Sequence, residues 1–239
     1  MEIQARKKSR VMDELVAMGL KGLSCYNEKP RFSISSSTLK KGRVLVREGG
    51  KFNGVYIVRS GFLKNVYFDA LSSEDKVLGF FFSGDFVGLD SVIKKQYRST
   101  VIALETVGVI KLSFSGLEDF PGDVYDRLEF LCFSNTRIQS ENDCFRNFFN
   151  KKAEARLASF FIDLSCRFEV QGYSPYCFRL PMKHQEIASY LNMTLETLSR
   201  IISRFKLEGA MSVKGHEYVI LEMDYLKSLM NRSGKRGLS

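Results

Sequence analysis

Short apolar and β-branched runs, separated by glycines, fill the first half of the chain, with no long helical pattern between them. Six such runs predict β-strands over residues 43–46, 55–58, 62–68, 77–82, 100–104 and 107–112. Glycines such as Gly49 and Gly84 stand between the runs, where tight turns need a backbone that glycine adopts freely. We therefore expect an antiparallel all-β domain over residues 31–119, preceded by an N-terminal arm over residues 1–30.

After Pro121 the pattern changes to that of a single helix of about 30 residues, predicted for residues 120–150. Positions at alternating steps of four and three residues form a heptad seam, which consists of Val124, Leu128, Leu131, Asn135, Ile138, Asn142, Phe145 and Phe149. A seam this long needs a partner helix, and the two asparagines within it would set the register. We expect the seam to pair two copies of the chain in a parallel homodimer. The alternative is that the same stripe packs against the β-domain, because Phe130, Phe133 and Phe148 blur it.

Residues 151–239 are predicted to be helix-rich, with an amphipathic helix over residues 153–168 and a turn near residues 172–175. Two short helices follow, separated by a break of two residues, and Thr194 is placed to cap the second one. The apolar positions expected to face inward are Ile187, Ala188 and Leu191 in the first helix and Leu195, Leu198, Ile201, Ile202 and Phe205 in the second. Two further β-runs within residues 210–222 predict a hairpin, so we expect a winged helix-turn-helix.

The outward face of the second helix carries side-chain types that read base edges in a major groove. Glu196, Ser199 and Arg200 lie near one another at three- and four-residue spacings. An arginine can bond O6 and N7 of guanine together, a glutamate can accept from N4 of cytosine, and a serine can supplement either. Arg204 and Lys206, further along the helix, suit contacts with phosphates. The alternative is a plain solvent-exposed face with a Glu196–Arg200 ion pair.

The charge distribution favours the same region as a contact for nucleic acid. The chain carries 36 Lys and Arg against 27 Asp and Glu, a net charge of +9, and residues 151–239 hold 14 basic and nine acidic side chains. A basic excess favours polyanionic partners, so we expect double-stranded DNA to bind the C-terminal part. No apolar stretch approaches the ~20 residues of a membrane span, and Asp13 and Glu14 interrupt the N-terminal apolar run. We expect no membrane association and a location in the cytoplasm.

Little in the sequence indicates metal or catalytic chemistry. The five cysteines are widely spaced, without a C-x-x-C pair, at Cys25, Cys132, Cys144, Cys166 and Cys177. With only two histidines, the chain lacks material for a zinc centre or a His-centred triad. Ser37 and Lys40 satisfy S-x-x-K, but so short a pattern arises by chance and has no companion motif here. We predict no catalytic residue, no metal site and no cofactor, and we favour a DNA-binding protein over an enzyme.

Short motifs in both halves of the chain are shared with one family of proteins. The C-terminal ones are Thr194-Leu-Glu-Thr-Leu-Ser-Arg200 and residues 152–159 and 172–175, and those of the β-domain are residues 58–61, 84–90 and 103–106. With these motifs the chain resembles the CRP/FNR family of transcription regulators, above all its fumarate and nitrate reduction regulator subgroup. The resemblance implies an α+β fold: an N-terminal cyclic-nucleotide-binding-like β-roll, a long dimerisation helix and a C-terminal winged helix-turn-helix.

The resemblance also implies a function, that of a homodimeric, sequence-specific transcription regulator that binds double-stranded DNA and contacts RNA polymerase. It places base reading on Glu196, Ser199 and Arg200. Leu195 stands where the cAMP-dependent relatives have an arginine, which implies an inverted repeat resembling TTGAT-N4-ATCAA. His184 stands where relatives have a phosphate-contacting arginine. The candidate phosphate contacts are Thr194, Thr197, Arg204, Lys206, His184 and Lys214.

In its sensory chemistry this sequence departs from the family. The subgroup's [4Fe-4S] cluster needs four thiolates, but Cys25 is the only cysteine in the N-terminal region and Ile110 occupies the β-roll position. We expect no such cluster, which leaves Cys25 as either a redox thiol or an ordinary cysteine. We do not expect cAMP to bind, because the family's Gly-Glu-Leu is here residues 88–90, Gly-Leu-Asp, without an acceptor for the ribose hydroxyl. The alternative, a regulator dependent on a cyclic nucleotide or another small molecule, would use a pocket at Gly88, Leu89, Arg98 and Ser99.

Overall fold

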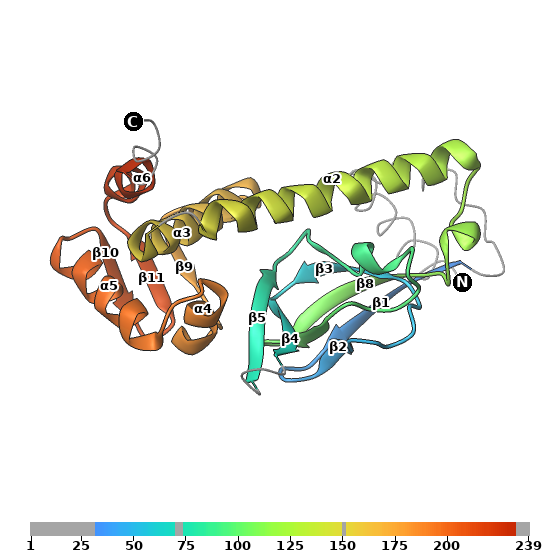
Figure 1. Ribbon diagram of the computed structural model, residues 1–239, viewed down its shortest axis with the longest axis horizontal. Helices are drawn as coiled ribbons and strands as arrows, with labels where there is room; N and C mark the ends of the chain where they lie inside the picture. The colour runs from blue at the N-terminus through green and yellow to red at the C-terminus, as the bar shows by residue number, and fades with distance from the viewer. Residues whose placement is uncertain (1–31, 70–73, 150–151, 233–239) are drawn as a thin grey trace. The chain divides into compact units, whose positions relative to one another are not determined.

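The chain divides into two units, which are described separately below. The computed structural model describes residues 32–69, 74–149 and 152–232, except the side chains of residues 74, 137, 140–149, 231 and 232. Residues 1–141 form the first unit and residues 142–239 the second, so the division falls within the long helix. The expected N-terminal arm and Cys25 lie outside the described residues. Figure 1 shows the strands of the first unit in blue to green and the helices of the second, from residue 153 on, in dark yellow to red.

Two four-stranded antiparallel sheets make up the first unit. Their strand orders are β1-β8-β3-β6 and β2-β7-β4-β5. The strands are β1 Ser33–Leu39, β2 Val44–Val46, β3 Val55–Ser60, β4 Leu63–Asp69, β5 Glu74–Phe81, β6 Phe86–Val87, β7 Thr100–Ala103 and β8 Val107–Ser113. The six predicted strands are confirmed as β2, β3, β4, β5, β7 and β8. The polar strand β1 and the two-residue strand β6 were not predicted.

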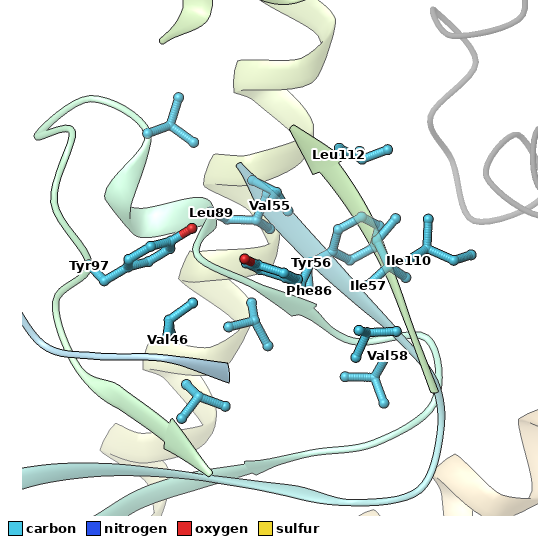
Figure 2. Close-up of a cluster of buried hydrophobic side chains, with 14 of the residues drawn as sticks. Val46, Val55, Tyr56, Ile57, Val58, Phe86, Leu89, Tyr97, Ile110 and Leu112 are labelled. Carbon is cyan, nitrogen blue, oxygen red and sulfur yellow. The ribbon is translucent and has the colours of Figure 1, made fainter. Parts of the chain in front are cut away.

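The core of the first unit lies where β3 meets β8. The residues from Val55 to Val58 are all buried, and in β8 the fully buried Ile110 and Leu112 lie opposite Ile57 and Val55. Figure 2 shows the side chains of these two strands in one cluster with Phe86 and Tyr97. Phenylalanines extend the core, with ring centroids of Phe32, Phe52, Phe114, Phe120 and Phe130 between 4.3 and 6.2 Å from a neighbouring ring of the group.

The long helix α2 spans Val124–Phe149. Its start follows from Asp123, whose carboxylate accepts hydrogen bonds from the amides of Tyr125 and Asp126 at 2.8 and 3.1 Å. Because Gly122 has a φ of 94°, outside the helical region, the helix begins later than the expected residue 120.

One side of α2 packs on the β-roll. Phe130 is buried and stacks on Phe120 with a centroid distance of 4.3 Å, and Phe133 meets Phe86 edge-on at 5.0 Å. Ile138 also packs against this core, so for this seam residue the structure shows the contact that the alternative predicts. Phe130 and Phe133, which lie outside the heptad seam, thus determine which side of α2 faces the β-roll.

Another side of α2 leaves seam residues exposed. Val124 is 65% and Leu128 50% exposed, whereas Leu131 is half-buried and Asn135 exposed. The remaining seam side chains, those of Asn142, Phe145 and Phe149, lie outside the described residues. Dimerisation through the seam therefore stays a prediction, supported by its exposed first turns.

From residue 152 on, the described part of the second unit contains four helices and three strands around an aromatic core. Its elements are α3 Ala153–Val170, β9 Cys177–Arg179, α4 His184–Tyr190, α5 Leu195–Leu207, β10 Met211–Lys214, β11 Glu217–Ile220 and α6 Met223–Arg232. The strands form an antiparallel sheet in the order β10-β11-β9. Phe161 of α3 lies against Phe178 of β9 and Tyr218 of β11, with centroids 6.4 and 5.4 Å apart. The predicted helix-turn-helix and hairpin are confirmed, and with them the α+β fold class. None of the described helices is long and apolar enough to cross a membrane.

Candidate nucleic-acid interface

Local hydrogen bonds define the two helices and the turn of the helix-turn-helix. At the start of α4 the amide of Lys183 donates to the carboxylate of Glu186 at 2.8 Å. The chain reverses at Asn192, whose φ of 50° lies in the left-handed region that asparagine tolerates better than most residues. Thr194 then begins α5, since its hydroxyl accepts a hydrogen bond from the amide of Thr197 at 3.2 Å. The predicted cap is confirmed.

Burial separates α5 into two faces. The inner face is packed in the core of the unit and consists of Leu198, Ile201, Ile202 and Phe205. The expectation that Leu195 also faces inward is wrong, because this residue opens the helix, one turn before Leu198, and is 42% exposed. On the opposite face Glu196, Ser199 and Arg200 are all exposed, as predicted for residues that read bases.

The charged groups on the outer face of α5 are available to a ligand. Hydrogen bonds from its own amide and from the Thr194 hydroxyl lower the pKa of Glu196, so this carboxylate is ionised near neutral pH. Within the part of the chain that the structure describes, no ion pair joins Glu196 to Arg200. The alternative of a face held together by that pair is therefore not realised. The Arg200 guanidinium keeps its five N–H donors for another acceptor.

The candidate phosphate contacts fall into two groups. Lys206 and Lys214 are exposed and engage no carboxylate among the described residues. The other candidates already have protein partners. The hydroxyl oxygens of Thr194 and Thr197 lie 3.1 Å apart, and Arg204 forms an ion pair with Glu154 of α3. A phosphate that binds Arg204 has to compete with this carboxylate.

His184, the last candidate, is bound to the wing. Its Nε2 lies 2.9 Å from the hydroxyl of Tyr218, in the middle of β11. Burial, followed by the charge of His216, lowers the pKa of His184, and burial raises the pKa of Tyr218 to about 12. At neutral pH the imidazole is therefore uncharged, which makes it a weaker phosphate contact than a charged side chain would be. His216 itself donates from Nδ1 to the carbonyl of Leu180 at 2.9 Å, which ties the wing turn to β9.

A shallow cavity of about 280 Å³ lies between the start of α3 and the exposed side of α5. Its charged lining consists of Lys152, which precedes α3, Glu154 of α3, and Arg200 and Arg204 of α5. Three cations, Arg200 among them, and one anion thus line a common space.

In the β-roll the four residues of the possible effector pocket differ in burial. Leu89 is buried, whereas Arg98 is exposed. Gly88 takes a φ of 92°, and a Cβ there would meet the ring of Tyr97 at 3.0 Å. Ser99 is half-buried. The space beside Gly88 is therefore taken up by a tyrosine ring.

Tyr97 is held in this place by hydrogen bonds. Its hydroxyl lies 2.8 Å from the carbonyl of Gly54 and 2.9 Å from Oδ1 of Asn53, which is also 3.3 Å from the Tyr56 hydroxyl. Burial raises the pKa of Tyr97, so the hydroxyl remains a donor. Figure 2 shows the two tyrosine oxygens among the aliphatic side chains of the core.

Sequence reasoning did not identify three residues whose contacts shape these candidate sites: Tyr97, Glu154 and Arg156. Tyr97 lies in the polar run of residues 94–100, so no local pattern signals that its ring is buried. Glu154 pairs with a residue 50 positions away, and Arg156 donates to the carbonyl of Asn192 at 3.1 Å; no local pattern signals either contact. Among the described residues, no group of three or more His, Cys, Asp and Glu side chains could hold a metal ion.

Comparison with known proteins identifies both units. The family model of the Crp-like helix-turn-helix domain matches residues 155–229, and that of the cyclic nucleotide-binding domain matches residues 37–121. The fumarate and nitrate reduction regulatory protein of Shigella dysenteriae is 35% identical over 192 residues, which is 80% of this chain and 76% of the relative. The protein of the same name from Escherichia coli K12 is 34% identical over the same shares.

The chain belongs to the CRP/FNR family. It is a DNA-binding transcription regulator of the CRP/FNR type. Helix α5 lies within the matched helix-turn-helix domain. Solved CRP/FNR-like structures share the fold. FixK2 from Bradyrhizobium japonicum has a TM-score of 0.72 at 24% identity, covering 82% of this chain and 97% of that one. The c-di-GMP-responsive regulator CLP from Xanthomonas campestris has a TM-score of 0.61 at 17% identity, covering 87% and 98%.

Proposed function

We propose that this CRP/FNR regulator binds an inverted repeat resembling TTGAT-N4-ATCAA. The observation that carries the proposal is the outer face of α5, where Glu196, Ser199 and Arg200 are exposed while the inner face is fixed in the core. A helix anchored in this way can enter a major groove without rearranging. Arg200 then bonds O6 and N7 of a guanine, and Glu196 accepts from N4 of a cytosine. Lys206 and Lys214 approach the phosphates.

We further propose that the protein binds this repeat as a homodimer. Val124 and Leu128 are exposed on α2, although Phe130 on another side of the same helix is buried in the β-roll. One helix can therefore pack on its own β-roll and still offer an apolar seam to a second copy. A symmetric dimer presents two recognition helices to half-sites ~34–36 Å apart, as an inverted repeat requires.

The proposal includes activity without an iron–sulfur cluster. Four thiolates would have to surround such a cluster, but the chain has one cysteine before Cys132. The β-roll position expected to carry the last ligand is Ile110, a fully buried core residue. The residues present do not fit a [4Fe-4S] group. Anaerobic reconstitution with iron and sulfide should leave the protein without bound iron.

The proposal also includes activity without cAMP. Leu89 is buried where the family has a ribose-binding glutamate, and the Tyr97 ring lies against Gly88. Adding cAMP at ~1 mM, far above the micromolar range of an effector site of ordinary affinity, should leave the DNA affinity unchanged. The second candidate, a small-molecule-dependent regulator, predicts that DNA affinity increases with such a ligand. RNA polymerase is proposed as a partner on the strength of the family relationship alone.

Fluorescence anisotropy with a labelled duplex tests the function. The wild-type chain should bind the inverted repeat ~10³-fold or more tightly than a duplex with scrambled half-sites at about 150 mM salt. The complex should contain two chains for each duplex. Equal affinity for the two duplexes would refute sequence-specific recognition, and a complex with one chain would refute the homodimer.

A further inference from the structure

One carboxylate lies among the cations beside the recognition helix. Glu154, in the first turn of α3, forms an ion pair with Arg204 of α5, and both side chains are partly exposed. The cavity beside this pair is lined on its other sides by Lys152 and Arg200. Glu154 is the only acidic residue in that described lining. It therefore occupies the position at which an external anion would meet Arg204.

The start of α3 is fixed against the helix-turn-helix by a second contact. Arg156, two residues beyond Glu154, donates from Nη2 to the carbonyl of Asn192 in the turn at 3.1 Å. The first turn of α3 thus touches both the turn and the recognition helix. Because this contact holds the backbone, the Glu154 carboxylate is directed at Arg204 by the fold.

Carboxylate and phosphate oxygens are equivalent acceptors for a guanidinium, so the two groups compete for Arg204. A partly exposed ion pair is weak in water. A DNA duplex, in contrast, presents a dense line of phosphates and gains entropy when a cation replaces its condensed counterions. The exchange of Glu154 for a phosphate is therefore favourable once α5 is seated in the groove and a phosphate reaches the cavity.

We propose that Glu154 is a built-in competitor of the DNA backbone and thereby a specificity-determining residue. In the free protein it holds Arg204, and it repels the phosphates of duplexes on which α5 does not seat. On the operator, docking of α5 delivers a phosphate that takes over Arg204. Glu154 therefore weakens non-specific complexes more than the specific one. This inference rests on the proposed function, because it requires DNA to approach the exposed side of α5.

The test compares Glu154→Gln with a matched control in the full-length chain. The control is Asp163→Asn, which removes the same charge from the same helix and also breaks an ion pair, with Arg167 at 2.9 Å. Affinities for the inverted repeat and for a random-sequence duplex are measured by anisotropy between ~50 and ~300 mM salt. Circular dichroism verifies that both variants are folded.

Glu154→Gln should bind the random duplex about two- to fivefold more tightly at low salt. Its salt dependence on that duplex should steepen by about 0.9 in the slope of log affinity against log salt, as one more phosphate is neutralised. Its preference for the inverted repeat should fall. Asp163→Asn should change neither quantity. In an Arg204→Ala background, Glu154→Gln should no longer steepen the slope, because the contested cation is gone.

Two results would overturn the inference while leaving the proposed function intact. In one, Glu154→Gln weakens binding to both duplexes as Arg204→Ala does, which would make Glu154 a support for Arg204. In the other, Glu154→Gln and Asp163→Asn behave alike, which would reduce the effect to net charge. Failure of the wild-type chain to bind either duplex at low salt would instead refute the proposed function, and this inference with it.

Discussion

The two units of this regulator both match models of their family but differ in how far the residues considered for function are exposed. In the second unit the polar residues of α5 are exposed, and Arg200 is free of any described carboxylate. In the first unit several residues considered for a sensory ligand lie in or against the core. Tyr97 lies against Gly88, and Leu89 and Ile110 are buried in the core.

This contrast shows that a fold and the sites placed on it vary independently. The strand order and core packing of the β-roll need apolar side chains inside, and an isoleucine at position 110 serves that need as well as any residue. A DNA surface, in contrast, needs specific polar groups at specific helical spacings. The family relationship therefore supports a residue-level proposal for α5, whereas for the first unit it supports the fold.

Removing the Tyr97 ring should have the largest effect, and on stability. Tyr97→Ala should lower the free energy of unfolding by ~3–5 kcal/mol, because it deletes a buried ring that packs on Gly88 and Phe52 and leaves the Gly54 carbonyl without its donor. Urea denaturation followed by fluorescence measures this. Tyr97→Phe, which keeps the ring, should lose only ~1–3 kcal/mol. A Tyr97→Ala protein as stable as the wild type would mean that the space is not filled as described.

Removing the Arg200 side chain should affect DNA binding and not stability. Arg200→Ala should weaken binding to the inverted repeat by ~1–3 kcal/mol and relax the preference at one base pair of each half-site. Its free energy of unfolding should stay within ~0.5 kcal/mol of the wild type, since the side chain is exposed. Lys206→Ala is the control, expected to weaken all duplexes alike. An unchanged base preference in Arg200→Ala, measured against a set of single-base operator variants, would contradict the assignment.

The cap of α5 should have an intermediate effect on stability. Thr194→Ala removes the acceptor for the Thr197 amide and should destabilise the second unit by ~1 kcal/mol. Thr194→Ser keeps the hydroxyl and should recover most of that loss. Thermal unfolding by circular dichroism distinguishes the two variants. If both lose the same stability, the methyl group of Thr194 matters and the cap does not.

The smallest effect should be a pH dependence that originates in the second unit. Burial and the charge of His216 hold the pKa of His184 below the value of 6.5 for an unperturbed histidine. As the pH falls, the unfolded chain therefore binds this proton first, and stability declines from about pH 7 through the folded pKa. In His184→Gln this part of the decline should be missing, whereas His216→Gln should retain a decline. The free energy of unfolding between about pH 7.5 and 5 tests this, and an unaltered slope in His184→Gln would contradict it.

Apolar periodicity predicted most of the fold because most elements have one buried face. It failed for β1, an edge strand of seven residues. Five of them are serine or threonine, and only Ile34 and Leu39 are half-buried. An edge strand with so little buried surface lacks the alternation that identifies the others. The strands β6 and β9, of two and three residues, are too short to show any period.

Contacts between residues far apart in the sequence are the part of the candidate site that the sequence could not predict. The three exposed residues on α5, Glu196, Ser199 and Arg200, share one face because of their helical spacing, so the sequence alone identified them. The pair between Glu154 and Arg204 joins two helices 50 residues apart, and the contact between His184 and Tyr218 joins α4 to the wing. Neither leaves a local signature. The burial of Tyr97, next to the exposed Arg98, likewise has no local signal.

The central claim is that the outer face of α5, presented twice by a symmetric dimer, reads duplex DNA. The most direct measurement is an anisotropy titration of one labelled duplex in three forms: the intact inverted repeat, the repeat with one half-site scrambled, and both half-sites scrambled. The wild-type chain should lose affinity at each step, and Arg200→Ala should discriminate less between the three. Equal affinity of the wild-type chain for all three duplexes would contradict the claim.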